Sequence, residues 1–213
     1  MNRDIDRVFW FTWLAVSQLR GGIEIDNGEA LYQQACHWVD SARNALREMG
    51  YSEQSTEHML YTQCALLDES VLNRKKQDSG YITWLATPLQ ARYFNTTNAG
   101  EDLWERIRNV LREPAPDVAV ITCFYRALTL GFVGRYREQR DERREDILEA
   151  LAAQATPFTL QHDAPVIVRV SGHTRGVRRW WLAWATGGVT LGAMWFAFNH
   201  VLQEMVARIV GQG

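Results

Sequence analysis

The sequence predicts an all-α fold followed by one membrane-spanning helix, and three observations support this prediction. Apolar residues recur at spacings of three and four along residues 1–156, which is the pattern of one face of an α-helix. Residues 180–203 contain no Asp, Glu, Lys or Arg, and a bilayer core requires only about 20 such residues. A basic segment separates the two. The predicted organisation is a helical domain (1–156), a basic linker (157–179), a transmembrane helix (180–203) and a short tail (204–213).

Charge is distributed unevenly along the 213 residues. The 23 Lys and Arg against 25 Asp and Glu give a net charge of −2. Residues 164–179 hold four arginines and no acid, and the only charges after them, Glu204 and Arg208, cancel, so residues 1–163 carry −6. An acidic domain argues against nucleic acid as a partner. The three cysteines form no CxxC pair, which favours reduced, buried thiols in a cytoplasmic domain over a disulfide framework or a zinc site.

The first helix is predicted over residues 3–20 and is rich in aromatic side chains. Its apolar run, Val8–Val16, follows two arginines and therefore also resembles the hydrophobic region of a signal peptide. Asp4 and Asp6 argue against a signal, and a cleaved signal would place three unpaired cysteines in an oxidising compartment. We interpret the segment as a helix of the domain.

Two longer helices follow. The first has one apolar stripe, with Asp26 or Asn27 as its N-cap and Gly50 at its end. The stripe consists of Leu31, Ala35, Trp38, Ala42, Ala45 and Met49. The second begins after Ser52 as its cap and repeats the same spacing. Its apolar positions are Leu60, Cys64, Leu67 and Val71, and residues 73–80 are predicted to be a polar loop.

Shorter helices complete the domain. Residues 81–94 are predicted to form helical pieces around Pro88, and a helix over residues 103–111 ends before Pro114.

Pro116 is placed at the start of the next helix, Val118–Val133. This helix is expected to be the buried centre of the bundle because Arg126 is its only charged residue. The mixed-charge run Glu138–Asp146 is expected to be a solvated surface that leads into a last helix.

The segment Trp180–Gln203 is predicted to cross a membrane because its 24 residues would form a helix about 36 Å long. The arginines before it predict, by the positive-inside rule, that the domain lies in the cytoplasm and the tail on the far side. A buried helix of the globular domain is the alternative. Ala185, Gly188 and Gly192 form a small-residue face, which is compatible with a homodimer through the membrane.

Catalytic and metal-binding patterns are absent from the sequence. The five histidines form neither an H-E-x-x-H motif nor a Glu-x-x-His pair, and there is no phosphate-binding glycine loop of the Walker type. We therefore expect no enzyme, no cofactor and no metal. The competing class is a membrane-tethered hydrolase that uses Cys64 or Cys123 with a histidine.

Asp68 and Glu69 are the most informative acidic residues because they follow an apolar run inside a helix. Adjacent helical positions diverge by about 100°, so the two carboxylates cannot act as an acid/base pair on one face. Asp68 lies beside the apolar stripe and needs an arginine or backbone partner. Two interpretations remain: a structural salt bridge, or one wall of an acidic groove that binds a partner.

Gly131 and Gly134, followed by Arg135, superficially resemble the Gly-x-x-Gly clamp of KH domains, but the strands of that fold are missing. We favour a close contact between a helix and a neighbouring helix or loop.

Four motifs of the sequence occur together in one known family. They are Tyr61–Leu72 with its Leu-Leu-Asp-Glu, Pro88–Gln90 before Tyr93 and Phe94, Gly100 and Glu101 before Leu103 and Trp104, and Leu128–Arg137. The last contains Gly131, Gly134, Arg135 and Tyr136 in the pattern Leu-Gly-Phe-x-Gly-x-Tyr-Arg. In these motifs the chain resembles the DotU/IcmH family of secretion-system proteins, over residues 5–155 and in the position of the terminal helix.

The resemblance implies an inner-membrane protein of the type VI secretion system with a cytoplasmic all-helical domain, two small bundles packed in a hook-like shape, one C-terminal transmembrane helix and a periplasmic C-terminus. Family members work with an IcmF-like membrane protein (TssM) and a lipoprotein (TssJ) in a complex that docks a phage-tail-like baseplate. They are scaffolds, and the peptidoglycan-binding domain that some carry is not expected here.

The resemblance also leads us to expect that Asp68, Glu69 and the segment Gly131–Arg137 shape the domain and a cleft that contacts baseplate proteins. The motifs leave open a type IVB secretion homologue. A generic tail-anchored adaptor unrelated to secretion is a further alternative.

Overall fold

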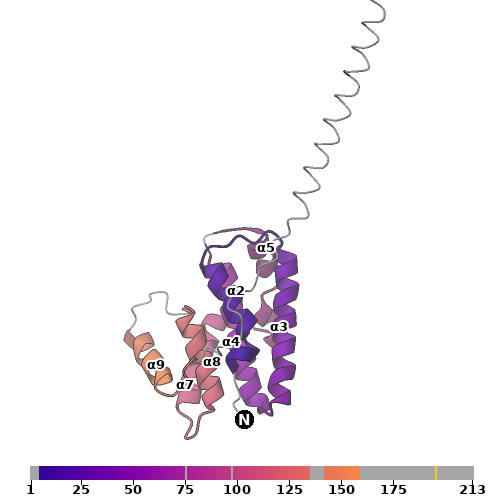
Figure 1. Ribbon diagram of the computed structural model, residues 1–213. Helices are drawn as coiled ribbons and strands as arrows, with labels where there is room; N and C mark the ends of the chain where they lie inside the picture. The colour runs from indigo at the N-terminus through magenta and orange to yellow at the C-terminus, as the bar shows by residue number, and fades with distance from the viewer. Residues whose placement is uncertain (1–4, 75, 97, 135–141, 159–194, 196–213) are drawn as a thin grey trace, which may run out of the picture. The chain divides into compact units, whose positions relative to one another are not determined.

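A computed structural model describes residues 5–74, 76–96, 98–134, 142–158 and 195 of the chain. Residues 1–159 and 160–213 form two separate units, and the description concerns the first. Its described residues form α-helices and no strand, which confirms the all-α prediction (Figure 1). Among the described residues no helix is long and apolar enough to cross a membrane. The predicted span, 180–203, lies outside them apart from Trp195.

The N-terminal segment forms two helices, α1 (Ile5–Val8) and α2 (Trp10–Arg20), where a single helix was expected. They are separated at Phe9, whose side chain is fully buried and packs against the ring of Trp13 with 5.4 Å between centroids. The break therefore coincides with a residue that the core holds in place.

Helices α3 (Gly28–Glu48) and α4 (Glu53–Leu72) begin at the predicted caps. The Asn27 side chain accepts the N–H of Ala30 at 2.9 Å, and the Ser52 hydroxyl accepts the N–H of Ser55 at 3.0 Å. Each bond satisfies one of the N–H groups that the first helical turn leaves without a partner. Both helix starts are thus determined locally.

The buried face of α3 is rotated by about one position from the predicted stripe. Ala35 and Ala42 are buried as expected, but Trp38 and the stripe's remaining members are only partly buried. The centre of the face consists instead of Tyr32, Cys36, Val39 and Leu46. The reason is tertiary: α3 packs mainly against α4 and α5 (Ser79–Ala86), which cover this side of the helix.

Helices α5 and α6 (Leu89–Phe94) are the predicted short pieces around Pro88, and α7 (Ala99–Leu111) ends three residues before Pro114. The polar loop after α4 is two residues shorter than expected because Asp78 caps α5 by accepting the N–H of Tyr81 at 3.1 Å.

Helix α8 (Val118–Thr129) is shorter than predicted at its end. Asp117 rather than Pro116 sets its start, since the Asp117 carboxylate accepts the N–H of Ala119 at 2.9 Å. The chain leaves the helix before Gly131, whose φ of +100° is a left-handed conformation that a helix cannot contain. Helix α9 (Glu142–Ala152) follows.

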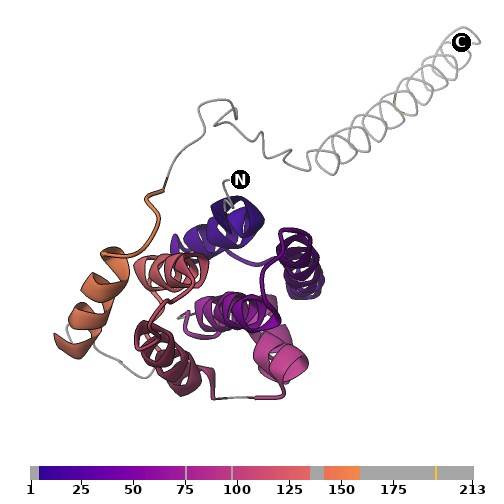
Figure 2. The ribbon, with the colours of Figure 1, turned by 90° about the horizontal axis from the view of Figure 1, so that it is seen from below.

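The centre of the domain is α4, and the expectation that residues 118–133 form it was wrong. Thirteen of the twenty residues of α4 are buried, and the helix contacts α2, α3, α5, α6, α7 and α8. Figure 2, seen from below, shows helices on every side of it. Helix α4 divides the domain into a group with α2, α3 and α5 and a group with α7, α8 and α9, but the buried residues of both belong to one core.

Candidate functional site

Asp68 joins α4 to the N-terminus of α6. The backbone N–H of Leu89 donates to Oδ1 at 2.9 Å and that of Gln90 donates to Oδ2 at 3.0 Å. Pro88 precedes α6 and has no polar side chain that could cap the helix. The Asp68 carboxylate, from α4, instead accepts the N–H groups at the start of α6, as an N-cap side chain would. Asp68 is 5% exposed, and burial raises its pKa to about 7 although both N–H groups favour the charged form.

Glu69 joins α4 to the turn after α8. The N–H of Val133 donates to Oε1 at 2.9 Å and that of Gly134 to Oε2 at 2.7 Å, while the Arg20 guanidinium lies 3.3 Å from Oε1. Burial raises the pKa of Glu69, and these donors oppose the rise. The adjacent carboxylates therefore bind different segments, Asp68 the start of α6 and Glu69 the turn after α8. This agrees with the divergence of about 100° expected for adjacent positions of a helix.

Two interpretations of Asp68 and Glu69 were left open, a structural salt bridge and one wall of an acidic groove, and the observed partners bear on both. Asp68 has backbone partners, and the only ion pair found for the two carboxylates within the described residues joins Glu69 to Arg20. Both side chains accept hydrogen bonds from the protein's own backbone, and these bonds connect α4 to the N-terminus of α6 and to the turn after α8.

Gly131 and Gly134 form the turn that Glu69 binds. At Gly134, φ is +56° and a Cβ would lie 2.6 Å from the carbonyl oxygen of Gly100, closer than real side chains approach. Gly134 thus allows a close contact between this turn and the start of α7, which is a helix–loop contact of the kind that we favoured over a nucleic-acid clamp. Arg135 and Tyr136 lie outside the described residues.

Two hollows share Glu69 as a lining residue, and we refer to them together as the central groove. One of about 260 Å³ is bordered by Asp68, Glu69, Pro88, Gln90, Phe132 and Gly134 among others. The second, about 440 Å³, is bordered by Glu69, Ser70, Val133, Arg20, Arg74 and Lys76 among others. Asn73 borders both. Three basic side chains line the larger hollow, so an acidic wall is only part of its chemistry.

Three buried polar atoms of residues that border the groove have no hydrogen-bond partner in the structure, namely Nε2 of Gln90, Oγ of Ser70 and Nε of Arg74. Gln90 and Ser70 are 2% and 3% exposed. Buried polar groups are normally paired, so these atoms are exceptions, and each of them is itself buried beneath the surface of the groove.

Sequence reasoning missed Arg144, which lies in the run expected to be a solvated surface. It is 8% exposed, and its Nη2 donates to the carbonyl oxygens of Leu128 at 3.1 Å and Phe132 at 3.5 Å. Arg144 thereby holds α9 to the end of α8 and to the turn beside the groove. Its position three residues before Ile147, on the apolar side of α9, was the available signal.

The thiols of Cys64 and Cys123, which the hydrolase alternative would use, are buried. Cys64 and Cys123 are fully buried, and burial raises the pKa of both thiols, which opposes thiolate formation. The part of the chain that the structure describes contains no group of three His, Cys, Asp or Glu that could hold a metal ion. The small residues Ala185, Gly188 and Gly192 lie outside that part.

Comparisons with known proteins agree on one group. The sequence profile of the family described as "Type VI secretion system protein DotU" matches residues 7–201. The crystal structure of the type VI secretion protein SciP/TssL from enteroaggregative Escherichia coli 042 is 55% identical, with a TM-score of 0.65, and the match covers 79% of this chain and 97% of that one. No match was found among curated proteins.

Two more distant structures share the fold. The cytoplasmic domain of TssL from Acinetobacter baumannii is 18% identical with a TM-score of 0.65, covering 70% of this chain and 94% of that one. DotU from Francisella novicida is 20% identical with a TM-score of 0.59, covering 72% of this chain and 99% of that one.

Proposed function

Because this chain belongs to the DotU family of type VI secretion system proteins, we propose that it is a structural scaffold of the secretion system's membrane complex. The observation that carries the proposal is the 55% identity to a TssL protein over 97% of that protein's solved chain. The family is a component of a membrane complex and not a known enzyme family. The buried, protonated thiols are in keeping with this role.

The scaffold is anchored in the bacterial inner membrane by residues 180–203, with residues 1–156 in the cytoplasm, residues 157–179 as a basic linker and residues 204–213 in the periplasm. The charge-free segment and its four preceding arginines support this topology. Alkaline phosphatase fused after Gly213 should be active, and green fluorescent protein at the same place should not fluoresce. The reverse pattern would overturn the topology.

Its partners are an IcmF-like inner-membrane protein (TssM), the lipoprotein TssJ through the same complex, and baseplate proteins on the cytoplasmic side. Purification of the full chain from detergent-solubilised membranes should recover the IcmF-like protein. Recovery of a type IVB partner instead would favour that secretion class, and recovery of neither would favour a generic tail-anchored adaptor.

The chain forms a homodimer through the membrane face of Ala185, Gly188 and Gly192, where small side chains let two helices approach closely. Gly188→Leu with Gly192→Leu should abolish cross-linking between tagged copies, whereas Val189→Leu, which keeps the small residues, should not.

The central groove binds a baseplate protein. Asp68 and Glu69 support this role by holding its walls in place, and the basic side chains of Arg20, Arg74 and Lys76 line its larger hollow. Asn73 is the best probe because it is exposed and borders both hollows. Asn73→Arg should weaken baseplate pull-down while leaving the IcmF-like partner bound. Asn109→Arg, an exposed site on α7, adds the same charge and should have no effect. Equal behaviour of the two variants would argue against the groove.

A further inference from the structure

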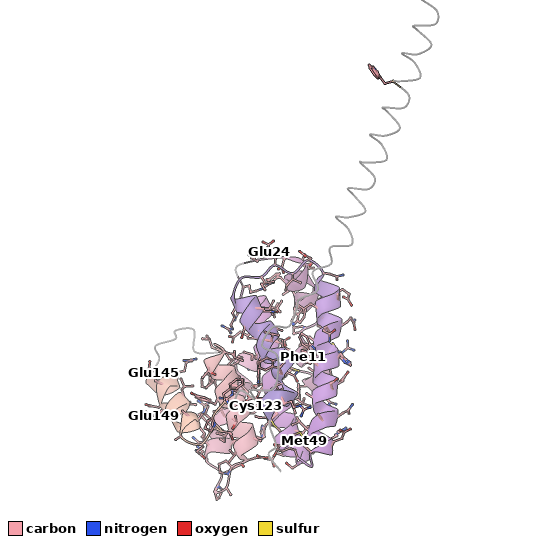
Figure 3. The ribbon with its side chains drawn as sticks, viewed as in Figure 1. Phe11, Glu24, Met49, Cys123, Glu145 and Glu149 are labelled. Atoms are coloured by element: carbon pink, nitrogen blue, oxygen red, sulfur yellow. The ribbon has the colours of Figure 1, made fainter. Side chains whose placement is uncertain are left out.

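Helix α2 exposes aromatic side chains that the core does not use. Trp10 is 40% exposed and Phe11 62% exposed, and Phe158, which follows α9, is 45% exposed. Phe11 stacks on Trp38 of α3 with 6.5 Å between ring centroids and 7° between planes, and Figure 3 shows Phe11 between these two helices. We refer to these four side chains as the aromatic face. Large aromatic side chains grouped on a surface usually mark a contact with a partner or a membrane.

A shallow hollow joins two members of this face. Trp10 and Phe158 border a space of about 270 Å³ together with Leu14 and Leu130. Arg126 also borders it, and its guanidinium lies 5.2 Å from the centre of the Phe158 ring. The apolar surface is therefore continuous from α2 across to the segment that follows α9.

Among the described residues, no acidic residue belongs to α2 or borders the hollow, although residues 1–163 carry −6. Helix α2 contains no Asp or Glu and ends in Arg20. The Arg126 guanidinium pairs with the carboxylate of Asp6: Nε donates to Oδ1 and Nη2 donates to Oδ2, each at 2.9 Å. Exposed acids such as Glu145 and Glu149 lie on α9, apart from Phe11 in Figure 3. Anionic headgroups would therefore repel other parts of the surface more strongly than this one.

The place where the chain leaves the domain adds a second argument. Phe158 belongs to the face and is followed by 21 residues, 159–179, before the proposed membrane helix. A chain of that length reaches at most about 75 Å, so the domain stays at millimolar effective concentration near the bilayer. Even a weak interfacial contact would then be occupied, and aromatic rings are the side chains that favour the headgroup region.

We infer that the aromatic face docks the domain onto the surface of the lipid bilayer in which the chain is anchored, and so fixes the orientation of the domain. The inference rests on the proposed anchor. A protein partner or a second copy on the same face is the competing occupant, and the experiment below separates them.

The test uses the full chain in nanodiscs of phosphatidylcholine and phosphatidylglycerol, with a fluorophore at Ser17→Cys on α2 or at Glu149→Cys on α9. Both positions are exposed, and the three native cysteines are buried and should not react. Lipids with a spin-labelled headgroup should quench the probe at position 17 about twofold or more above the probe at position 149. Trp10→Ser with Phe11→Ser should reduce quenching at position 17 to the level at position 149.

Ile82→Ser with Leu85→Ser is the matched control, because it removes two exposed apolar side chains from α5 and should leave the quenching unchanged. Equal quenching at positions 17 and 149 in the unsubstituted face would overturn the inference. So would contact between probes at position 17 on two copies without lipid quenching, which would assign the face to self-association. Failure of the chain to co-elute with nanodiscs would refute the anchor itself, and docking with it, whereas co-elution without selective quenching refutes docking alone.

Discussion

Replacement of Asp68 by Asn tests whether this buried carboxylate holds α6 against α4. Both oxygens accept a backbone N–H in the native domain, at 2.9 Å from Leu89 and 3.0 Å from Gln90. Asn retains one oxygen, but its amide group would face the second N–H, which would remain buried without a partner. A loss of this kind lowers the free energy of unfolding by about 1–3 kcal/mol.

The effect should depend on pH with a defined sign. Burial raises the pKa of Asp68 from 3.8 to about 7, so the folded state binds this proton more tightly than the unfolded state. The native domain therefore has the full contribution of Asp68 below about pH 4 and loses up to about 4 kcal/mol of it as the pH rises to and beyond 7. Asn does not titrate. The deficit of Asp68→Asn should therefore be larger near pH 5 than near pH 8, where it should shrink or reverse.

Urea unfolding of residues 1–158, followed by circular dichroism at about pH 5 and about pH 8, measures this difference. Residues 1–159 form a compact unit, which supports use of the fragment. Glu57→Gln, which alters a half-exposed carboxylate paired with Arg106, is the control and should show a small deficit at both pH values. A deficit of Asp68→Asn that is the same at both pH values would refute the reasoning.

Three further predictions concern the groove and the thiols. Gly134→Ala should lower the free energy of unfolding by about 2–4 kcal/mol in the same assay, because it combines a positive φ with a clash, whereas Gly22→Ala, with φ +88° and open space, should cost only about 1 kcal/mol; equal costs would count against the close contact at Gly134. Arg144→Met should cost about 1–3 kcal/mol and speed amide exchange at residues 132–134, since it removes donors to two carbonyl groups; unchanged exchange would argue against this role. Cys64 and Cys123 should react with iodoacetamide far more slowly in the native chain than in urea, as measured by mass spectrometry, and rapid native labelling of either would revive the hydrolase alternative.

The starts of α3 and α4 show what short-range sequence information is able to predict. An N-cap bonds to an N–H group two or three residues away, so Ser52, and Asn27 as one of two candidates beside Asp26, could be proposed without knowledge of the rest of the fold. The end of α8 could not be predicted from the sequence in the same way. The apolar pattern continues to Val133, and only the left-handed conformation of Gly131 shows that the helix has already ended.

Asp68, Glu69 and Gly134 were singled out from the sequence and border the groove, but their partners were not predicted. Asp68 was expected to need a backbone or arginine partner, and its donors lie 21 and 22 residues away in the sequence. Glu69 accepts the N–H groups of Val133 and Gly134, which lie 64 and 65 positions further along the chain. No local periodicity encodes such distances, because they depend on how separate helices pack around α4.

By itself the sequence determined the helical class, most helix boundaries, the family resemblance and the separation of charge between an acidic domain and a basic linker. These follow from side-chain periodicity and backbone capping, which act over three or four residues. Only the tertiary structure decided that α4 is the central helix, that Arg144 is buried, and that Asp68 binds the N-terminus of α6 while Glu69 binds the turn after α8. Burial and long-range hydrogen bonding exist only once distant segments have packed together.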